Sequence, residues 1–157
     1  MAPLRDNRGH FISSGPKNRG SNTRRCEEFS AELKSVAIRL PQELINPFVR
    51  KITLQVLTGV VQKTPVDTGR ARGGWQVNQG GPPQSSPIRL DPSGQATIAD
   101  GYREIASLPD YPTVYISNNV RYIGYLEQGK PGPGSNQAPN GMAALTLREV
   151  ASQFGDG

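Results

Sequence analysis

The chain has 157 residues, 34% of them hydrophobic, and 18 Lys and Arg against 13 Asp and Glu give a formal net charge of +5. The length favours one domain, and the low apolar content beside 18 Gly and 14 Pro predicts a small core with long irregular loops. The chain has one cysteine, Cys26, which excludes an internal disulfide. Its one histidine, His10, disfavours a zinc site or a Cys/His nucleophile pair. No apolar run approaches the ~20 residues that cross a bilayer.

The positive charge is concentrated in residues 1–25, where six basic residues face one acidic residue, Asp6. This segment is rich in Gly, Ser, Asn and Pro and has too few apolar residues to fold alone. Three interpretations stay open: a solubilising tail, an arm that becomes ordered on a neighbouring subunit, and a segment that binds nucleic acid through phosphate contacts. We therefore predict a flexible basic arm, 1–25, and a single domain, 26–157. The basic residues of the arm are Arg5, Arg8, Lys17, Arg19, Arg24 and Arg25.

Two helices are expected next. Residues 26–40 place apolar side chains on one face at helical spacing, with Glu27 and Glu28 in the first turn, where the helix dipole favours anions. Residues 42–63 carry a wider apolar stripe between Pro41 and Pro65, and this second helix is predicted to be the central core element.

The remaining elements are shorter. Residues 64–75 form a turn rich in Gly and Arg. After it, short segments with the apolar spacing of strands or helices are interrupted by two loops rich in Pro and Gly. Ile98, Tyr102 and Ile105 are expected on one face of a helix. The predicted strands are 75–77 and 112–117, the helices 95–107, 121–128 and 141–154, and the loops 79–94 and 129–140. This order predicts an α+β fold, with a small, mostly antiparallel sheet against one long helix and several shorter helices.

Three segments together form a distinctive combination of motifs. They are TPVDTGRARGGW (64–75), VYISNNVRYIGYLEQG (114–129) and SNQAPNGM (135–142). In this order, and with the last segment directly before a helix, they resemble small neck proteins of long-tailed bacteriophages. These form the tail-completion and tail-terminator (head–tail joining) family, the minor tail protein Z-like group. The resemblance covers residues 26–154. The matching positions are Gly69, Arg70, Trp75, Asn118, Tyr122, Leu126, Glu127, Gly129, Gln137, Pro139, Gly141 and Met142.

Two departures from the family pattern stand out. Gly74 occupies a position that is usually Asn, and the linker after Gly129, KPGPGSNQAP, is longer than the usual one. The resemblance implies a structural role in the virion, in a ring, commonly of six copies, at the head-proximal end of the tail tube. It implies contacts with other copies, with the tail tube protein and with the head-completion or connector protein, and DNA passing through the lumen without sequence-specific binding. No catalytic residue, cofactor or membrane contact is implied, and assembly would take place in the host cytoplasm.

Several of these residues can be interpreted physically. Trp75 and Tyr122 are large surfaces that suit a core or an interface. Asp67 suits a role in a turn or a helix cap, or a role as the ion-pair partner of an arginine on another subunit. Arg70 and Arg72 suit either ion pairs with Asp67 or Glu127, or contacts across an interface, because the planar guanidinium binds carboxylates with two hydrogen bonds.

The surroundings of Glu127 leave two roles open: an ion pair with Arg70 or Arg121, or a solvated surface charge.

An alternative function is another connector layer of the neck, a head-completion or adaptor protein. A nucleic-acid-binding accessory protein that uses the basic arm is a further alternative. An enzyme is disfavoured because the acidic residues are scattered without a recognisable motif.

Overall fold

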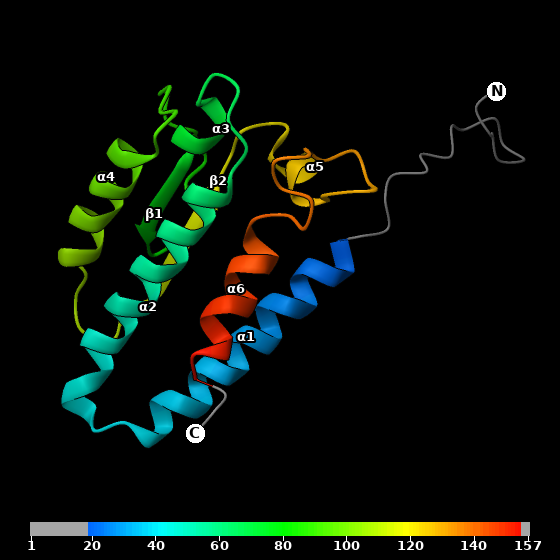
Figure 1. Cartoon of the computed structure of the whole chain (residues 1–157). Coiled ribbons are helices and arrows are strands. Elements are labelled where there is room, and N and C mark those ends of the chain that lie inside the picture. Colours follow the sequence, from blue (N-terminus) through cyan, green and yellow to red (C-terminus); the bar gives the residue numbers. More distant parts are fainter. Residues whose placement is uncertain (1–18, 155–157) are drawn as a thin grey trace, which may run out of the picture.

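The computed structural model describes residues 19–154, which form six helices and two strands. Their arrangement confirms the predicted α+β class with a small antiparallel sheet (Figure 1). The helices are α1 (Arg19–Arg39), α2 (Gln42–Lys63), α3 (Arg70–Gly73), α4 (Gln95–Ala106), α5 (Ile123–Glu127) and α6 (Ala143–Ser152), and the strands are β1 (Trp75–Gln79) and β2 (Val114–Asn118). No helix in this part of the chain is long and apolar enough to cross a membrane.

The central element is α2, and its predicted bounds are confirmed. Pro41 stands at its N-cap, and Thr64, which precedes Pro65, is already extended. The apolar stripe of α2 is buried, with Leu57 and Val61 fully covered. Figure 1 shows why: α4 lies on one side of α2, and α1 and α6 lie on the other. The two sides of α2 therefore carry different parts of the molecule.

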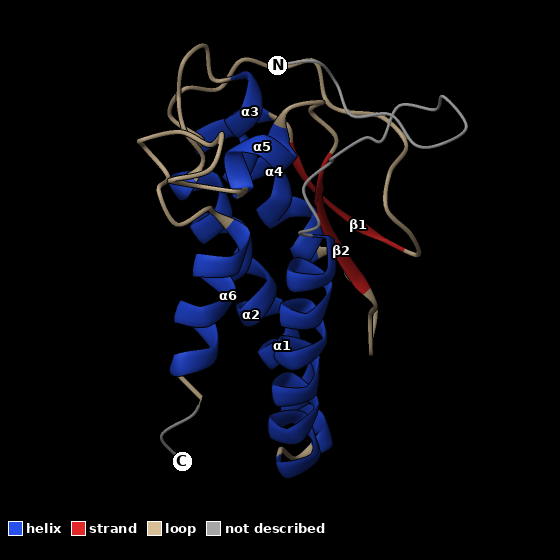
Figure 2. Ribbon diagram, turned by 90° about the vertical axis from the view of Figure 1, so that its right-hand side faces the viewer, coloured by secondary structure: helices blue, strands red, loops and turns tan. Residues whose placement is uncertain are grey.

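The sheet has two strands, β1 and β2, which pair antiparallel with Trp75 opposite Asn118 and Val77 opposite Ile116. Trp75 and Val77 are buried and join the core built on α2. Alternate residues of β1 thus point inward, as expected for a strand with one covered face. In the view of Figure 2 the two strands lie at one edge of the helices.

The inner face of α4 differs from the prediction. Thr97, Gly101 and Ile105 are buried, whereas Tyr102 is 57% exposed. The reason is close packing at Gly101, where a Cβ atom would lie 2.1 Å from Leu57 Cδ2. A glycine lets the α4 backbone approach α2 directly, and this turns Tyr102 outward.

The first helix begins earlier than predicted. α1 starts at Arg19 and not at residue 26, so Arg19, Arg24 and Arg25 of the predicted arm lie in a helix. Residues 1–18 of that arm, with Arg5, Arg8 and Lys17, lie outside the described residues, so the predicted arm is not tested there. α1 packs on α6, and Phe29 and Leu33 lie half-buried against the core.

Candidate functional site

The turn 64–75 is organised around a buried hydroxyl. Thr64 is fully buried, and its Oγ1 donates to the Val60 carbonyl at 2.6 Å and accepts from Trp75 Nε1 at 2.7 Å. Trp75 is 7% exposed and belongs to the core. The structure therefore places this indole in the core, with its one polar atom satisfied by Thr64.

The arginines of this turn bind backbone carbonyls. Arg72 donates from Nη2 to the carbonyls of Thr64 at 2.9 Å and Gln62 at 3.1 Å, and from Nη1 to that of Pro92 at 2.7 Å. Arg70 donates from Nη1 to the carbonyl of Pro87. The expected ion pairs with Asp67 or Glu127 are not formed, because the guanidinium groups instead bind carbonyls at the C-terminal end of α2 and in the loop before α4. Asp67 is exposed and makes no ion pair with another described residue.

Two amide side chains join the three sequence segments. Gln137 Oε1 accepts from the Val66 N–H at 2.9 Å, and its Nε2 donates to the Val66 carbonyl at 3.1 Å, as a neighbouring strand would. Asn118 Nδ2 donates to the Ala71 carbonyl at 2.8 Å. Residues separated by more than forty positions thus fix the turn 64–75 from both sides.

Glu127 has a role that the sequence did not reveal. Its Oε2 accepts from the N–H groups of Met142 at 2.9 Å and Ala143 at 2.8 Å, and its Oε1 from that of Ala144 at 2.9 Å. The expected pairing with Arg70 or Arg121, and the solvated alternative, are both wrong. The first N–H groups of α6 lack partners within the helix, and the positive end of the helix dipole favours a carboxylate there.

The other residues of the pattern support this arrangement. The backbones of Gly69, Gly129 and Gly141 have positive φ angles of 84°, 62° and 75°, which glycine adopts without strain. The Pro139 carbonyl accepts from the Lys130 N–H at 2.7 Å, and Met142 is fully buried. We call Thr64, Arg72, Asn118, Glu127 and Gln137, together with the backbone groups they bind, the motif framework.

Tyr122 and Leu126 lie at the edge of the framework. Tyr122 is 43% exposed, so it is not a core anchor, and Leu126 is half-buried. Both line a small hollow together with Pro65, Asp67 and Gln137.

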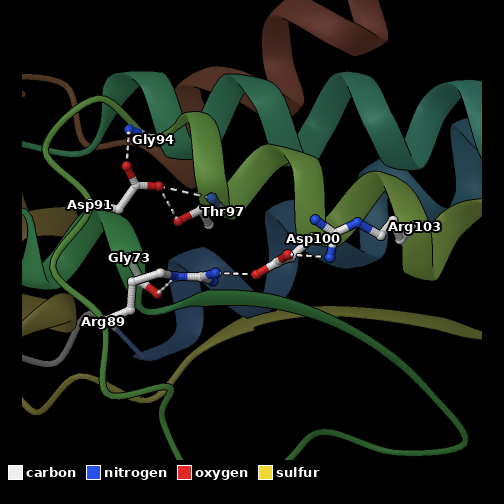
Figure 3. Close-up of polar contacts among 7 residues, drawn as sticks. All are labelled: Gly73, Arg89, Asp91, Gly94, Thr97, Asp100 and Arg103. Carbon is white, nitrogen blue, oxygen red and sulfur yellow. Dashed lines mark hydrogen bonds and ion pairs between the residues drawn. The ribbon is translucent and has the colours of Figure 1, made fainter.

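A second polar cluster, missed by the sequence analysis, surrounds residues 87–91, which we call the strap (Figure 3). Asp91 is 5% exposed and accepts from the N–H groups of Gly94 at 2.9 Å and Thr97 at 2.8 Å, and from Thr97 Oγ1 at 2.7 Å. It thereby caps α4. Burial raises the pKa of the Asp91 carboxyl, but the hydrogen bonds from Thr97, Ser93 and Gly94 outweigh this effect, so the pKa lies below its ordinary value.

The strap is held along its whole length. Arg89 forms an ion pair with Asp100 and donates from Nε to the Gly73 carbonyl, as Figure 3 shows, while Arg103 shares the same carboxylate at 2.7 Å. The Asp91 N–H donates to the Gly69 carbonyl at 3.2 Å. The only sign of this arrangement in the sequence is the run Asp-Pro-Ser-Gly (91–94) directly before the helix, since Asp and Ser are typical of helix starts.

Exposure alternates along the strap. Arg89 and Asp91 point inward, whereas Ile88 is 99% exposed and Leu90 is 66% exposed. The segment that carries the most exposed large apolar side chain of the described residues is thus held by hydrogen bonds and an ion pair on both sides of that side chain.

On the other side of α2, an apolar groove of ≈ 610 Å³ lies between α1, α2 and β2. We call it the α1 groove. Its lining is mostly apolar and includes Phe29, Leu33, Val56, Val114, Ile116 and Leu147. Cys26 lies at the groove and is exposed.

The carboxylates of these clusters are engaged by structural contacts. Asp91 and Glu127 accept backbone N–H groups, and Asp100 binds two arginines. Within residues 19–154, no group of three or more His, Cys, Asp or Glu side chains is arranged to hold a metal ion. The described site residues serve to fix backbone positions.

Comparisons of the chain with protein-family models, with curated proteins and with solved structures find no match.

Proposed function

We propose that this chain is a structural protein of the neck of a long-tailed bacteriophage. In this proposal, copies of the chain form a ring at the head-proximal end of the tail tube, which completes or terminates the tail and joins it to the head connector. The protein acts through its shape and its contacts, without catalysing a reaction.

One observation carries the proposal. The three segments that resemble the neck family are far apart in the sequence, yet the side chains of the pattern bind one another's backbone. Gln137 binds Val66, Asn118 binds Ala71, and Glu127 binds the first N–H groups of α6. A pattern that fixes loop positions, with its carboxylate engaged by a helix end, suits a building block better than an active site.

The proposed partners follow from the resemblance. They are other copies of the chain in a ring, commonly of six, the tail tube protein on one face and the head-completion or connector protein on the other. DNA would pass through the lumen without sequence-specific contacts. The described part of the predicted arm offers exposed cations at Arg24 and Arg25 on α1, which suit an acidic neighbour.

The test is the structure of particles made without this protein. Electron microscopy should show overlong or headless tails if the protein terminates tail growth, and complete but unattached heads and tails if it completes the neck. Normal, infectious virions made in its absence would contradict the proposal. Turnover of a small molecule by the purified chain, dependent on its own side chains, would also contradict it.

A further inference from the structure

The α1 groove has an open strand edge on one of its walls. The sheet has two strands, so one edge of β2 is paired with β1 and the other edge has no neighbouring strand among the described residues. In this part of the chain, residues 112–118 make no backbone–backbone hydrogen bond apart from the pairing with β1. β2 also lines the groove, through Val114 and Ile116. A groove with unpaired N–H and C=O groups on one wall suits an extended segment, which can bind as an added strand.

The lining of the groove favours an uncharged, apolar occupant. Lys34 is the one charged side chain among the described residues that line it, and Lys34 is exposed, so its ammonium group can stay in water. Glu127, which lies near Cys26, is already engaged by the N–H groups of α6. Phe29 and Leu33 are only half-buried, so filling the ≈ 610 Å³ groove would remove apolar surface from water. A charged segment would lose hydration there without gaining a partner.

One segment outside the described residues has a matching composition. Residues 9–16, GHFISSGP, contain no Asp, Glu, Lys or Arg, in contrast to the basic residues on either side of them. They include Phe11 and Ile12, whose residue types favour strands. Neighbouring side chains of a strand point to opposite faces, so either register places one of these two in the groove. Residues 155–157, Gly-Asp-Gly, offer no large apolar side chain.

The position of α1 brings this segment within reach of the groove. α1 begins at Arg19, and Cys26, which lies at the groove, follows about 10 Å further along the same helix. An extended chain covers ~3.3 Å per residue, so the stretch from Phe11 to Arg19 can span up to about 26 Å. Residues 9–16 can therefore turn back into the groove of their own chain. The tether also keeps their effective concentration at the groove high, on the order of mM.

We propose that residues 9–16 bind in the α1 groove of their own chain and pair with the open edge of β2 as a third strand. This pairing satisfies the outer backbone groups of β2, and Phe11 or Ile12 fills part of the groove. The inference concerns contacts within one molecule, so it does not depend on the proposed neck function.

The thiol of Cys26 reports on this docking, because Cys26 is exposed and lies at the groove. The experiment uses full-length protein and measures the rate at which an uncharged maleimide modifies Cys26. Replacing both apolar side chains, Phe11→Ser with Ile12→Ser, should raise this rate about ten- to a hundredfold, since it removes the groups that hold the segment in place. Burial, with Glu127 and Glu27 nearby, raises the pKa of the thiol, so both proteins are compared at one mildly alkaline pH.

Two matched controls separate docking from a general change in reactivity. Leu4→Ser also removes an apolar side chain but lies outside residues 9–16, and it should leave the Cys26 rate unchanged. Ser35→Cys with Cys26→Ser moves the thiol to the opposite face of α1, about two and a half turns away, at an exposed position that does not line the groove. The rate at this position should be the same with and without the substitutions at Phe11 and Ile12.

Hydrogen exchange of residues 112–118, measured by mass spectrometry on the same proteins, tests the strand pairing. The outward amides of β2 should exchange about tenfold faster in the Phe11→Ser, Ile12→Ser variant than in the natural chain. An unchanged Cys26 rate in that variant would overturn the proposal, and so would a faster Cys26 rate with unchanged exchange in β2. Protection of Cys26 that grows with protein concentration would show that a second copy supplies the segment, which would overturn docking within one chain.

Discussion

Two regions of the molecule, the polar motif framework with the strap and the apolar α1 groove, use their side chains in opposite ways. On the α4 side and in the motif framework, Asp91, Arg72 and Glu127 are engaged with backbone groups or helix ends of the same chain. On the α1 side, an apolar groove stays open. The polar pattern of the sequence therefore serves to hold the fold, whereas the apolar surface of the groove is left open by the described residues.

The largest effect on stability is expected at Trp75. Trp75→Ala should lower the free energy of unfolding by about 3–5 kcal/mol, because it leaves a cavity and removes the donor that satisfies Thr64 Oγ1. Urea denaturation followed by circular dichroism measures this loss. Trp75→Phe, which keeps a ring but no N–H donor, should cost less. Unchanged stability together with lost assembly would move Trp75 to the interface.

The next effect is expected at Glu127. Glu127→Ala should cost about 2 kcal/mol, since three N–H groups at the start of α6 lose a charged acceptor. Glu149→Ala is the matched control. The Glu149 side chain is half-exposed and pairs with Lys63, and such surface pairs contribute less than about 1 kcal/mol. Equal losses in the two variants would show that the cap contributes no more than a surface ion pair.

The contribution of Asp91 to the free energy of unfolding should depend on pH. Its pKa in the folded protein is below the ordinary 3.8, so its ionised form stabilises the fold fully above that value, and the contribution is lost as pH falls through the lower folded pKa. Asp91→Asn should therefore cost about 1–3 kcal/mol near neutral pH. The difference from the natural protein should shrink at acidic pH.

Urea denaturation across a pH series checks this prediction, with the exposed Asp67→Asn as a control of little effect. A gap between the natural protein and Asp91→Asn that stays constant down to about pH 2 would contradict a lowered pKa for Asp91.

The smallest effect on stability is expected at the strap surface. Ile88 is 99% exposed, so Ile88→Ser should change the free energy of unfolding by less than about 0.5 kcal/mol. Leu108→Ser, at a buried position, should destabilise strongly and serves as the contrast. Thermal melting of both variants measures the difference. A large loss of stability for Ile88→Ser would mean that the Ile88 side chain contributes to folding in spite of its exposure.

The sequence predicted the backbone better than the side-chain contacts. The bounds of α2 were predictable because a wide apolar stripe runs between two prolines, Pro41 and Pro65. The inner face of α4 was not, because it depends on how closely the Gly101 backbone approaches Leu57, and periodicity carries no information on that distance.

The roles of the polar residues were the least predictable. Sequence reasoning paired arginines with carboxylates, the strongest partners in general. In the fold, Arg72 lies among unpaired carbonyls and Glu127 beside unpaired N–H groups. Only the three-dimensional placement of loop and helix ends creates those groups. The short helix α3 was missed for the same reason, since the turn that contains it is fixed by distant residues such as Asn118.

The linker between α5 and α6 is fastened where it leaves the body. Glu127 holds the start of α6, and the Lys130 N–H donates to the Pro139 carbonyl, so the outer residues 131–133 lie beyond a closed base. Extra length there adds only loop-closure entropy, about 0.6 kcal/mol for each doubling. Related chains can therefore differ in length at this place while both helices keep their positions, and the segment offers a location for a peptide tag or a fluorophore.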